Sequence, residues 1–447
     1  MTVDTSAAST DPADPADNTA ASATSDTESG GTRPLRPAER FGVRAAVIFG
    51  LVLLLWQLFG VINHFLDNYL LDVGVFRDAG RAIVENGGLY GDDFDSRSGF
   101  AFIYPPIAAG LFVPLTWLSE PVMEAAWTFA SLAAAWAVLA MAAHRLRLPR
   151  PVLLAFPLLG LALCLEPLQT HLMYGQINVF LVFLFTADLL GYTPRWMRGA
   201  GVGLAAGIKI TPAAFALAFL VSRRWGDLAR SAGTFFLTVA IGWVMRPEES
   251  LFYWTDEFFN GDRGGPPEYE ANQALTGLIT RAGVDGDLAQ TIMIPGLLVI
   301  AAITAFAAAR LLRAGRPVTT LLLLILAVAV AAPISVTHHW TGIIVAAVLL
   351  VAMLRDAVAG RGTDWITFAG VVVLLAANML PDNALAGDTL YRAFEQQWFL
   401  SNLQGIAGVV CLVLLLVTAW KVRPASSTGN FYEEVPATPV RELSLAE

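Results

Sequence analysis

Runs of apolar residues about as long as a lipid bilayer is thick constrain this chain most. The runs Ala45–Ile62 and Asn402–Trp420 approach the roughly 20 residues that a helix needs to cross a membrane. Hydrophobic residues make up 56% of the 447-residue chain and charged residues 15%, whereas soluble proteins carry about 25% charged residues. The sequence therefore predicts an all-α polytopic membrane protein.

The two ends of the chain differ in amino-acid composition from its middle. Residues 1–30 consist mainly of Ala, Ser, Thr, Asp and Pro and contain no basic residue, so they have almost nothing to bury. We expect a disordered acidic tail over residues 1–41, a membrane domain over 42–423 and a second disordered tail over 424–447. Much of the net charge of −9 lies in the first tail, and we expect no nucleic-acid partner. Without a cleavable signal peptide, export depends on the first spanning helix.

The distribution of Arg and Lys predicts the orientation, because short cytoplasmic loops carry the excess of basic residues. If every basic cluster is cytoplasmic, both termini are cytoplasmic and the loops left outside are acidic or mixed, which is self-consistent. The basic clusters are Arg33–Arg44, His144–Arg150, Pro194–Arg198, Ser222–Trp225, Ala309–Arg316, Arg355 with Arg361, and Lys421–Arg423. The predicted outer loops are Asn63–Tyr104, Glu166–Gln176, Pro247–Asp287, Pro333–His339 and Pro381–Ser401.

Two intervals between basic clusters are too short for a pair of full spans. The segment Gly199–Val221 must enter and return as two half-length helices broken at Lys-Ile-Thr-Pro, where Pro212 removes a backbone donor. The segment Pro151–Gly191 predicts a second shallow hairpin. The total is about twelve membrane segments. Alternatively, Gly199–Val221 is one span, which would reverse everything downstream against the charge bias.

Four residues at predicted outer helix ends are candidates for chemistry. Asp72 precedes a predicted amphipathic helix over Val75–Asn86, either as its N-cap or as a catalytic carboxylate. Lys209 lies inside a membrane segment, at a cost of about 2.5–3.5 kcal/mol on insertion scales, so it faces a polar cavity or snorkels. His338 and His339 either form a site or are interfacial histidines satisfied by backbone. They are not a zinc motif, because no third ligand stands at the usual spacing.

Further amides and an arginine are predicted at the same side of the membrane, namely Gln176, Asn178, Asn272 and Arg281. Their hydrogen-bonding groups suit a polyhydroxylated ligand. A carboxylate beside cations fits a transfer in which a base removes a hydroxyl proton and an anionic leaving group is stabilised.

Six ordered motifs between Asp72 and Trp340 resemble those of the actinobacterial membrane mannosyltransferases of glycosyltransferase family 87. They are "DVGVFRDAGRAIVENGGLY", "FIYPPIAAGLFVPL", "YGQINVFL", "GIKITPAAFALAFLVSRRW", "NQALTGLITR" and "PISVTHHW". The resemblance implies a C-type glycosyltransferase fold and a polyprenyl-phosphate sugar donor, typically mannose, whose sugar is inverted to an α-linkage, here α-(1→2). The acceptor would be a cell-envelope glycolipid or glycan on the outer face.

The resemblance also implies roles for individual residues. Asp72 would be the general base, and Lys209 would face the donor phosphate. The phosphate or sugar would bind His338, His339 and Arg281. Sugar or acceptor hydroxyls would bind Gln176, Asn178, Asn272, Gln273 and Tyr104. Phe76 stands where relatives often have Tyr. We expect no metal requirement and no cofactor.

Two other functions compete with this interpretation. The same fold could transfer arabinofuranose from decaprenyl-phosphate-arabinose, because the sequence does not select the sugar. A transporter or lipid flippase also breaks helices and buries charge, but this sequence lacks paired interrupted helices in corresponding halves. A non-catalytic scaffold would leave Lys209 without a purpose.

Overall fold

The computed structural model describes residues 37–260, 264–379 and 398–423. Within these ranges the chain is helical, and β-structure is limited to two isolated bridges. Six of the described helices are long and apolar enough to cross a membrane, and shorter apolar helices pack between them. The predicted all-α multi-spanning architecture is confirmed, whereas the figure of about twelve membrane segments stays a prediction.

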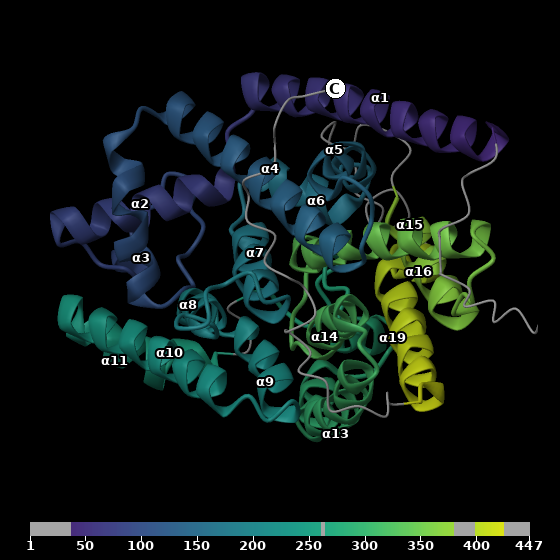
Figure 1. Cartoon of the computed structure of the whole chain (residues 1–447). Coiled ribbons are helices and arrows are strands. Elements are labelled where there is room, and N and C mark those ends of the chain that lie inside the picture. The colour runs from purple at the N-terminus through teal and green to yellow at the C-terminus, as the bar shows by residue number, and fades with distance from the viewer. Residues whose placement is uncertain (1–36, 261–263, 380–397, 424–447) are drawn as a thin grey trace, which may run out of the picture.

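The helices follow one another without a sheet (Figure 1). In chain order they are α1 (Pro37–Asp67), α2 (Leu71–Glu85), η1 (Gly91–Asp93), α3 (Pro106–Phe112), η2 (Val113–Trp117), α4 (Glu120–Arg145), α5 (Pro151–Ala162), α6 (Glu166–Tyr174), α7 (Asn178–Leu189), α8 (Ala200–Ile208), η3 (Thr211–Ala216), α9 (Leu217–Val221), α10 (Trp225–Met245), α11 (Pro247–Thr255), η4 (Glu257–Phe259), α12 (Leu275–Arg281), α13 (Gly286–Arg313), α14 (Pro317–Ala331), η5 (Thr337–Ile343), α15 (Ile344–Val358), α16 (Trp365–Asn378), α18 (Trp398–Ser401) and α19 (Leu403–Lys421).

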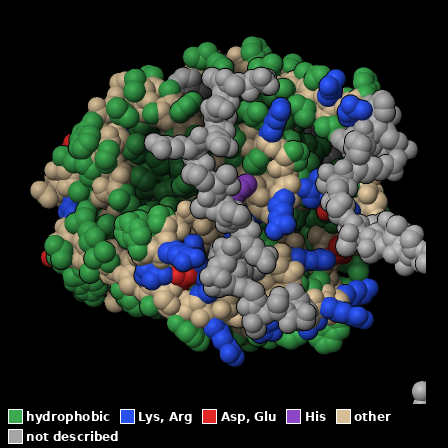
Figure 2. Space-filling model, viewed as in Figure 1, with side chains coloured by type: hydrophobic (Ala, Val, Ile, Leu, Met, Phe, Trp, Pro, Cys, Tyr) green, Lys and Arg blue, Asp and Glu red, His purple; other side chains and the backbone are tan. Residues whose placement is uncertain are grey.

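The sequence "PVTTLLLLILAVAVA" of α14 is apolar on every side, as in a helix surrounded by protein. Nearly all of its residues are buried, and they join α15 and α19 in the main core. By contrast, α1 runs along the edge of the molecule (Figure 1), and many of its large apolar side chains are exposed. Exposed apolar side chains also cover much of the hollowed face in Figure 2. Such surfaces suit lipid contact.

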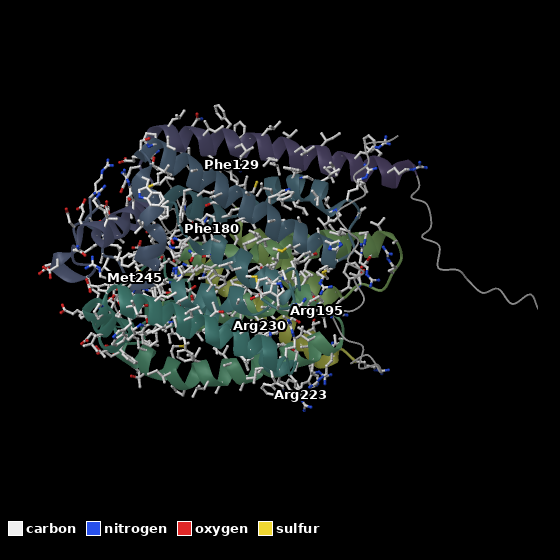
Figure 3. All side chains as sticks on the ribbon, turned by 60° about the vertical axis from the view of Figure 1, so that its left-hand side comes forward. Phe129, Phe180, Arg195, Arg223, Arg230 and Met245 are labelled. Atoms are coloured by element: carbon white, nitrogen blue, oxygen red, sulfur yellow. The ribbon has the colours of Figure 1, made fainter. Side chains whose placement is uncertain are left out.

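The segment from Gly199 to Val221 enters and returns, as predicted. Helix α8 ends at Ile208, and the chain re-forms as η3 and α9. Both flanks meet the start of α10, since Arg230 donates to the Arg198 carbonyl at 2.8 Å and Arg224 pairs with Asp227. Arg195, Arg223 and Arg230 also lie toward one side, away from Met245 at the other end of α10 (Figure 3). A single crossing is therefore wrong.

The second predicted hairpin is also present. Helix α5 runs in, α6 turns and α7 returns, so that the end of α7 meets the end of α4. Arg145 donates to the Leu190 carbonyl at 2.9 Å, and the Tyr192 hydroxyl donates to the Met141 carbonyl at 3.1 Å. The turn at α6 thus lies at the end of the molecule opposite to these contacts.

Two predicted boundaries differ from the structure. Helix α1 begins at Pro37, five residues before the predicted start of the membrane domain, and residues 1–36 and 424–447 lie outside the described ranges. Helix α2 begins at Leu71 rather than Val75, so Asp72 lies in its first turn and is not the N-cap. The helix starts early because a distant carboxylate, Glu124, accepts the N–H of Leu70 at 2.9 Å.

Candidate active site

Lys209 lies where the Gly199–Val221 hairpin breaks. It caps α8 in an extended conformation, and Pro212 in η3 prevents the helix from continuing. Its Nζ donates to Asn178 Oδ1 at 3.1 Å and lies 2.9 Å from His339 Nε2. The ring of Tyr104 lies 5.7 Å from the same nitrogen, within range of a cation–π contact. The lysine is held in a polar cluster, so the snorkelling alternative is not needed.

The turn between α6 and α7 supplies the amides. Gly175 ends α6 at a φ of +68°, and a Cβ at this position would lie 2.9 Å from Val73 Cγ1. Directly after this turn, Gln176 Oε1 accepts from Asn178 Nδ2 at 3.4 Å. The same Asn178 amide donates to the His338 carbonyl at 3.2 Å. Asn178 therefore connects the turn to both the lysine and the histidine pair.

Asp72 faces this cluster from α2. Burial raises the pKa of Asp72 from 3.8 to about 7, whereas a hydrogen bond to the Gln176 side chain and the charge of Lys209 act in the opposite direction. A carboxyl group with a pKa near neutrality is suited to take and release a proton at physiological pH. Asp72, Gln176, Asn178, Lys209 and His339 thus form one continuous polar chain.

The two histidines differ in their surroundings. Because the ammonium of Lys209 donates, His339 must accept at Nε2, which leaves Nδ1 for its hydrogen bond to the Ile334 backbone. His338 instead stands edge-on to Tyr174, with ring centroids 5.9 Å apart, and 4.9 Å from the His339 ring. Only His339 is in contact with Lys209 in the polar chain described above, and both histidines are partly exposed.

Sequence reasoning missed His171. Its side chain is fully buried on α6, and neither ring nitrogen has a hydrogen-bond partner among the residues that the structure describes. Burial and the charge of Lys209 lower the pKa of His171 to about 3, so the imidazole is neutral. Its carbonyl accepts the N–H of Gln176 at 2.9 Å. The only signal in the sequence was a histidine five residues before Gln176 in a polar stretch.

The remaining predicted residues form a neighbouring network. Asn272 Oδ1 accepts the N–H of Ser335 at 2.9 Å, and the Gln273 N–H donates to the Ser335 carbonyl at 2.9 Å. Arg281 donates to the Asn402 side chain and to the carbonyls of Tyr269 and Asn272. The contacts to Ser335 hold in place the loop that precedes His338. The predicted binding roles of Asn272, Gln273 and Arg281 stay predictions.

Burial lowers the pKa of Arg281 to about 10, and the charge of Glu270 opposes this shift. Phe76 stacks on Phe112 with ring centroids 4.6 Å apart and lies in the core. Tyr104 is buried against Phe76 at 5.4 Å. Among the described residues no group of three His, Cys, Asp or Glu side chains has the arrangement of a metal site.

Comparison with known proteins identifies the family. The model of glycosyltransferase family 87 matches residues 102–337, a range that includes Gln176, Asn178 and Lys209. The chain is 34% identical over 327 residues to a Mycolicibacterium smegmatis protein named polyprenol-phosphate-mannose-dependent alpha-(1-2)-phosphatidylinositol pentamannoside mannosyltransferase, covering 71% of this chain and 75% of that protein.

Two further similarities were found. A Mycobacterium tuberculosis protein, named polyprenol-phosphate-mannose-dependent alpha-(1-2)-phosphatidylinositol mannoside mannosyltransferase, is 30% identical over 336 residues, covering 71% of this chain and 77% of its own length. The crystal structure of ArnT from Cupriavidus metallidurans bound to undecaprenyl phosphate aligns with a TM-score of 0.40 and 16% identity, over 85% of this chain and 77% of ArnT.

The helices long enough to cross a membrane and the match to this family define the class of protein, a membrane glycosyltransferase. The chain belongs to glycosyltransferase family 87. Membership of this family agrees with the C-type fold that the motifs implied.

Proposed function

We propose that this enzyme transfers a mannosyl residue from polyprenyl-phosphate-mannose to a glycolipid of the phosphatidylinositol mannoside class, with inversion to an α-(1→2) linkage. The names of its relatives supply the donor and acceptor classes. The observation that carries the proposal is the polar chain from Asp72 through Gln176 and Asn178 to Lys209.

Asp72 is the general base in this mechanism. Its carboxylate takes the proton of the acceptor hydroxyl while the hydroxyl oxygen attacks the anomeric carbon opposite the phosphate. The bond between that carbon and the phosphate oxygen breaks, and polyprenyl phosphate leaves. The donor phosphodiester carries one negative charge and the leaving phosphate two, and the charge gained there is the one that Asp72 loses on protonation.

Lys209 stabilises the charge that grows on the leaving phosphate. A fixed cation in a site that excludes water acts most strongly on charge that develops in the transition state. We assign to His338, whose ring stands beside that of His339, a contact with the same phosphate or with the sugar. A donor with a polyprenyl tail is dissolved in the bilayer, so its phosphate meets groups at helix ends.

The orientation is part of the proposal. Arg and Lys clusters at one side of the molecule favour cytoplasmic termini and an active site on the extracytoplasmic side of the plasma membrane. There the enzyme meets envelope glycolipids. The loop Pro381–Ser401 of this side lies largely outside the described residues.

The test is transfer from synthetic polyprenyl-phosphate-mannose, radiolabelled in the sugar, to mannosylated phosphatidylinositol in membranes containing the wild type or the Asp72→Asn variant. The expected result is a loss of turnover of about 10²–10⁴-fold, with donor binding retained, because the amide keeps the size of the side chain. Asp92→Asn, exposed in η1 after α2, is the matched control. Full turnover by Asp72→Asn would exclude the proposed base.

The same assay separates the rival functions. Decaprenyl-phosphate-arabinose replaces the mannose donor in a parallel reaction, and arabinosyl transfer without mannosyl transfer would favour the arabinofuranosyltransferase. Movement of labelled donor across sealed vesicles without product would favour a transporter.

A further inference from the structure

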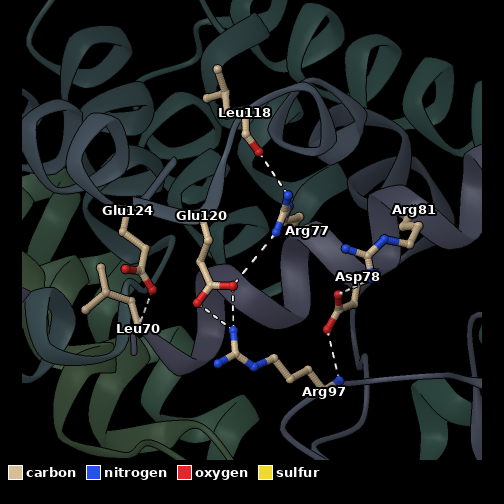
Figure 4. A network of polar contacts seen from close by, with 8 residues as sticks. All are labelled: Leu70, Arg77, Asp78, Arg81, Arg97, Leu118, Glu120 and Glu124. Carbon is tan, nitrogen blue, oxygen red and sulfur yellow. Dashed lines mark hydrogen bonds and ion pairs between the residues drawn. The ribbon is translucent and has the colours of Figure 1, made fainter. Parts of the chain in front are cut away.

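Helix α4 contacts two separate parts of the site through side chains one turn apart. Glu124 is 5% exposed, and its Oε1 accepts the N–H of Leu70 at 2.9 Å. Figure 4 shows this carboxylate directed at Leu70, apart from the pair formed by Glu120 and Arg97. Leu70 is the N-cap of α2, and no side chain caps that helix locally. Asp72 follows two residues later, so Glu124 fixes the start of the helix turn that bears the carboxyl group.

Trp127 makes the second contact from the same face of α4. Its Nε1 donates to the Gln176 carbonyl at 3.2 Å. Its ring also packs on Phe76 of α2, with centroids 5.8 Å apart, and on Phe180 of α7 at 4.9 Å. Residues three apart on a helix are neighbours on its surface. From adjacent positions on α4, the indole therefore contacts the Gln176 backbone and the carboxylate contacts the Leu70 backbone, two residues before Asp72.

We propose that Glu124 and Trp127 are positioning residues that together set the separation between Asp72 and Gln176. This inference rests on the proposed role of Asp72 as the base. Neither side chain touches the reacting groups. Both act on backbone atoms, Glu124 on the N–H of Leu70 and Trp127 on the carbonyl of Gln176. The hydrogen bond between the side chains of Asp72 and Gln176 joins the two segments that these backbone contacts hold in place.

The experiment compares kcat, the donor KM and the pH profile of folded, detergent-purified variants. Glu124→Ala removes the acceptor, whereas Glu124→Gln keeps an oxygen that can accept the same N–H. Trp127→Phe removes the donor and keeps a ring. Misplacing a catalytic group by about 1 Å can cost about 10²-fold, so Glu124→Ala and Trp127→Phe are each expected to lower kcat about 10- to 100-fold, with the donor KM within about threefold. Glu124→Gln is expected to recover most of the activity.

Two further readouts distinguish positioning from general stability. When α2 shifts away from Gln176 and Lys209, both of which lower the Asp72 pKa, the acid limb of kcat/KM should move to higher pH in Glu124→Ala. The double variant should lose less activity than the product of the two single losses, because each single change already frees the distance between Asp72 and Gln176. Controls are Glu85→Ala, exposed at the end of α2, and Trp117→Phe, 76% exposed.

The inference is overturned if Glu124→Ala and Trp127→Phe turn over like wild type, if Glu124→Gln is as damaged as Glu124→Ala, or if the losses multiply without a shift of the acid limb. Its failure differs from failure of the proposed function. Full turnover by Asp72→Asn removes the base, whereas an inactive Asp72→Asn beside a fully active Glu124→Ala removes only the positioning role.

Discussion

Lys209 Nζ lies 2.9 Å from His339 Nε2, although 130 residues separate them in the chain. The contact joins the break in the Gly199–Val221 hairpin to the 3-10 turn η5 before α15. Because the lysine donates, the imidazole is neutral and accepts. The two adjacent histidines therefore have different partners, and their substitution should have different effects.

His339→Leu should lower both stability and donor affinity. The variant leaves the Lys209 ammonium without one acceptor, and an unsatisfied buried polar group costs about 1–3 kcal/mol. His338→Leu should reduce turnover with little change in Tm, because no side-chain hydrogen bond of His338 is lost within the described part of the chain. Thermal unfolding in detergent and kcat/KM for the donor measure the two effects. Equal falls in Tm for both variants would contradict this division.

Lys209→Met should lower kcat/KM by about 10²–10³-fold, the usual cost of losing a charge-stabilising group. Lys209→Arg should recover part of this loss, since it keeps the charge but has a different shape. Lys421→Met, at the exposed end of α19, provides a control of the same chemistry. Transfer rates at several donor concentrations give the result. A Met variant with the wild-type kcat/KM would show that the lysine only stabilises the fold.

The pH dependence of kcat/KM should have an acid limb near pH 7. The pKa of Asp72 is raised to about 7, so the carboxyl group is protonated and inactive as a base below that pH. Activity should rise with pH through this range and then level off. Gln176→Leu removes a hydrogen bond that lowers the Asp72 pKa, so its limb should move upward. A downward movement in Gln176→Leu, or a wild-type limb below pH 5, would contradict the assignment.

Gly175→Ala should reduce activity as well as stability. The left-handed conformation costs an L-residue about 1–2 kcal/mol, and the new Cβ would lie 2.9 Å from Val73 Cγ1. Relief of this clash displaces Gln176 or Val73, next to Asp72. Gly360→Ala is a matched control with the same φ of +68° and nothing within 4 Å of the Cβ. Both variants should lose thermal stability, and only Gly175→Ala should lose turnover.

Much of the fold could be predicted from the sequence because a bilayer imposes simple rules. The positions of Arg and Lys and the short interval around Pro212 were sufficient to predict the hairpin at Gly199–Val221. The start of α2 was predicted four residues late, because its N-terminus is stabilised by Glu124. Leu70 and Glu124 are 54 positions apart in the chain, so the sequence around α2 gives no sign that the two residues are in contact.

The same limit applies to the candidate site. Lys209 was identifiable because a charge inside a membrane segment is costly, whereas the local sequence left Asp72 open between an N-cap and a catalytic carboxylate, and only the family resemblance implied its role as the base. His171 was not identifiable, since a buried histidine in a polar stretch resembles any loop residue. Asn272, Gln273 and Arg281 were grouped with the site by their predicted side of the membrane. In the structure, Asn272 accepts the N–H of Ser335, the Gln273 side chain donates to the Ser401 carbonyl and Arg281 donates to Asn402, and their predicted binding roles stay predictions.

The contact between Lys209 and His339 also has a consequence for biosynthesis. The ribosome completes the carboxylate, the amides and the lysine long before it reaches the imidazole that anchors that lysine. A nascent chain halted after α13 thus contains most of the reactive groups, yet its ammonium still lacks this partner. In the proposed mechanism the site is therefore complete only late in synthesis, when the segment after α14 has been made and has docked against Lys209.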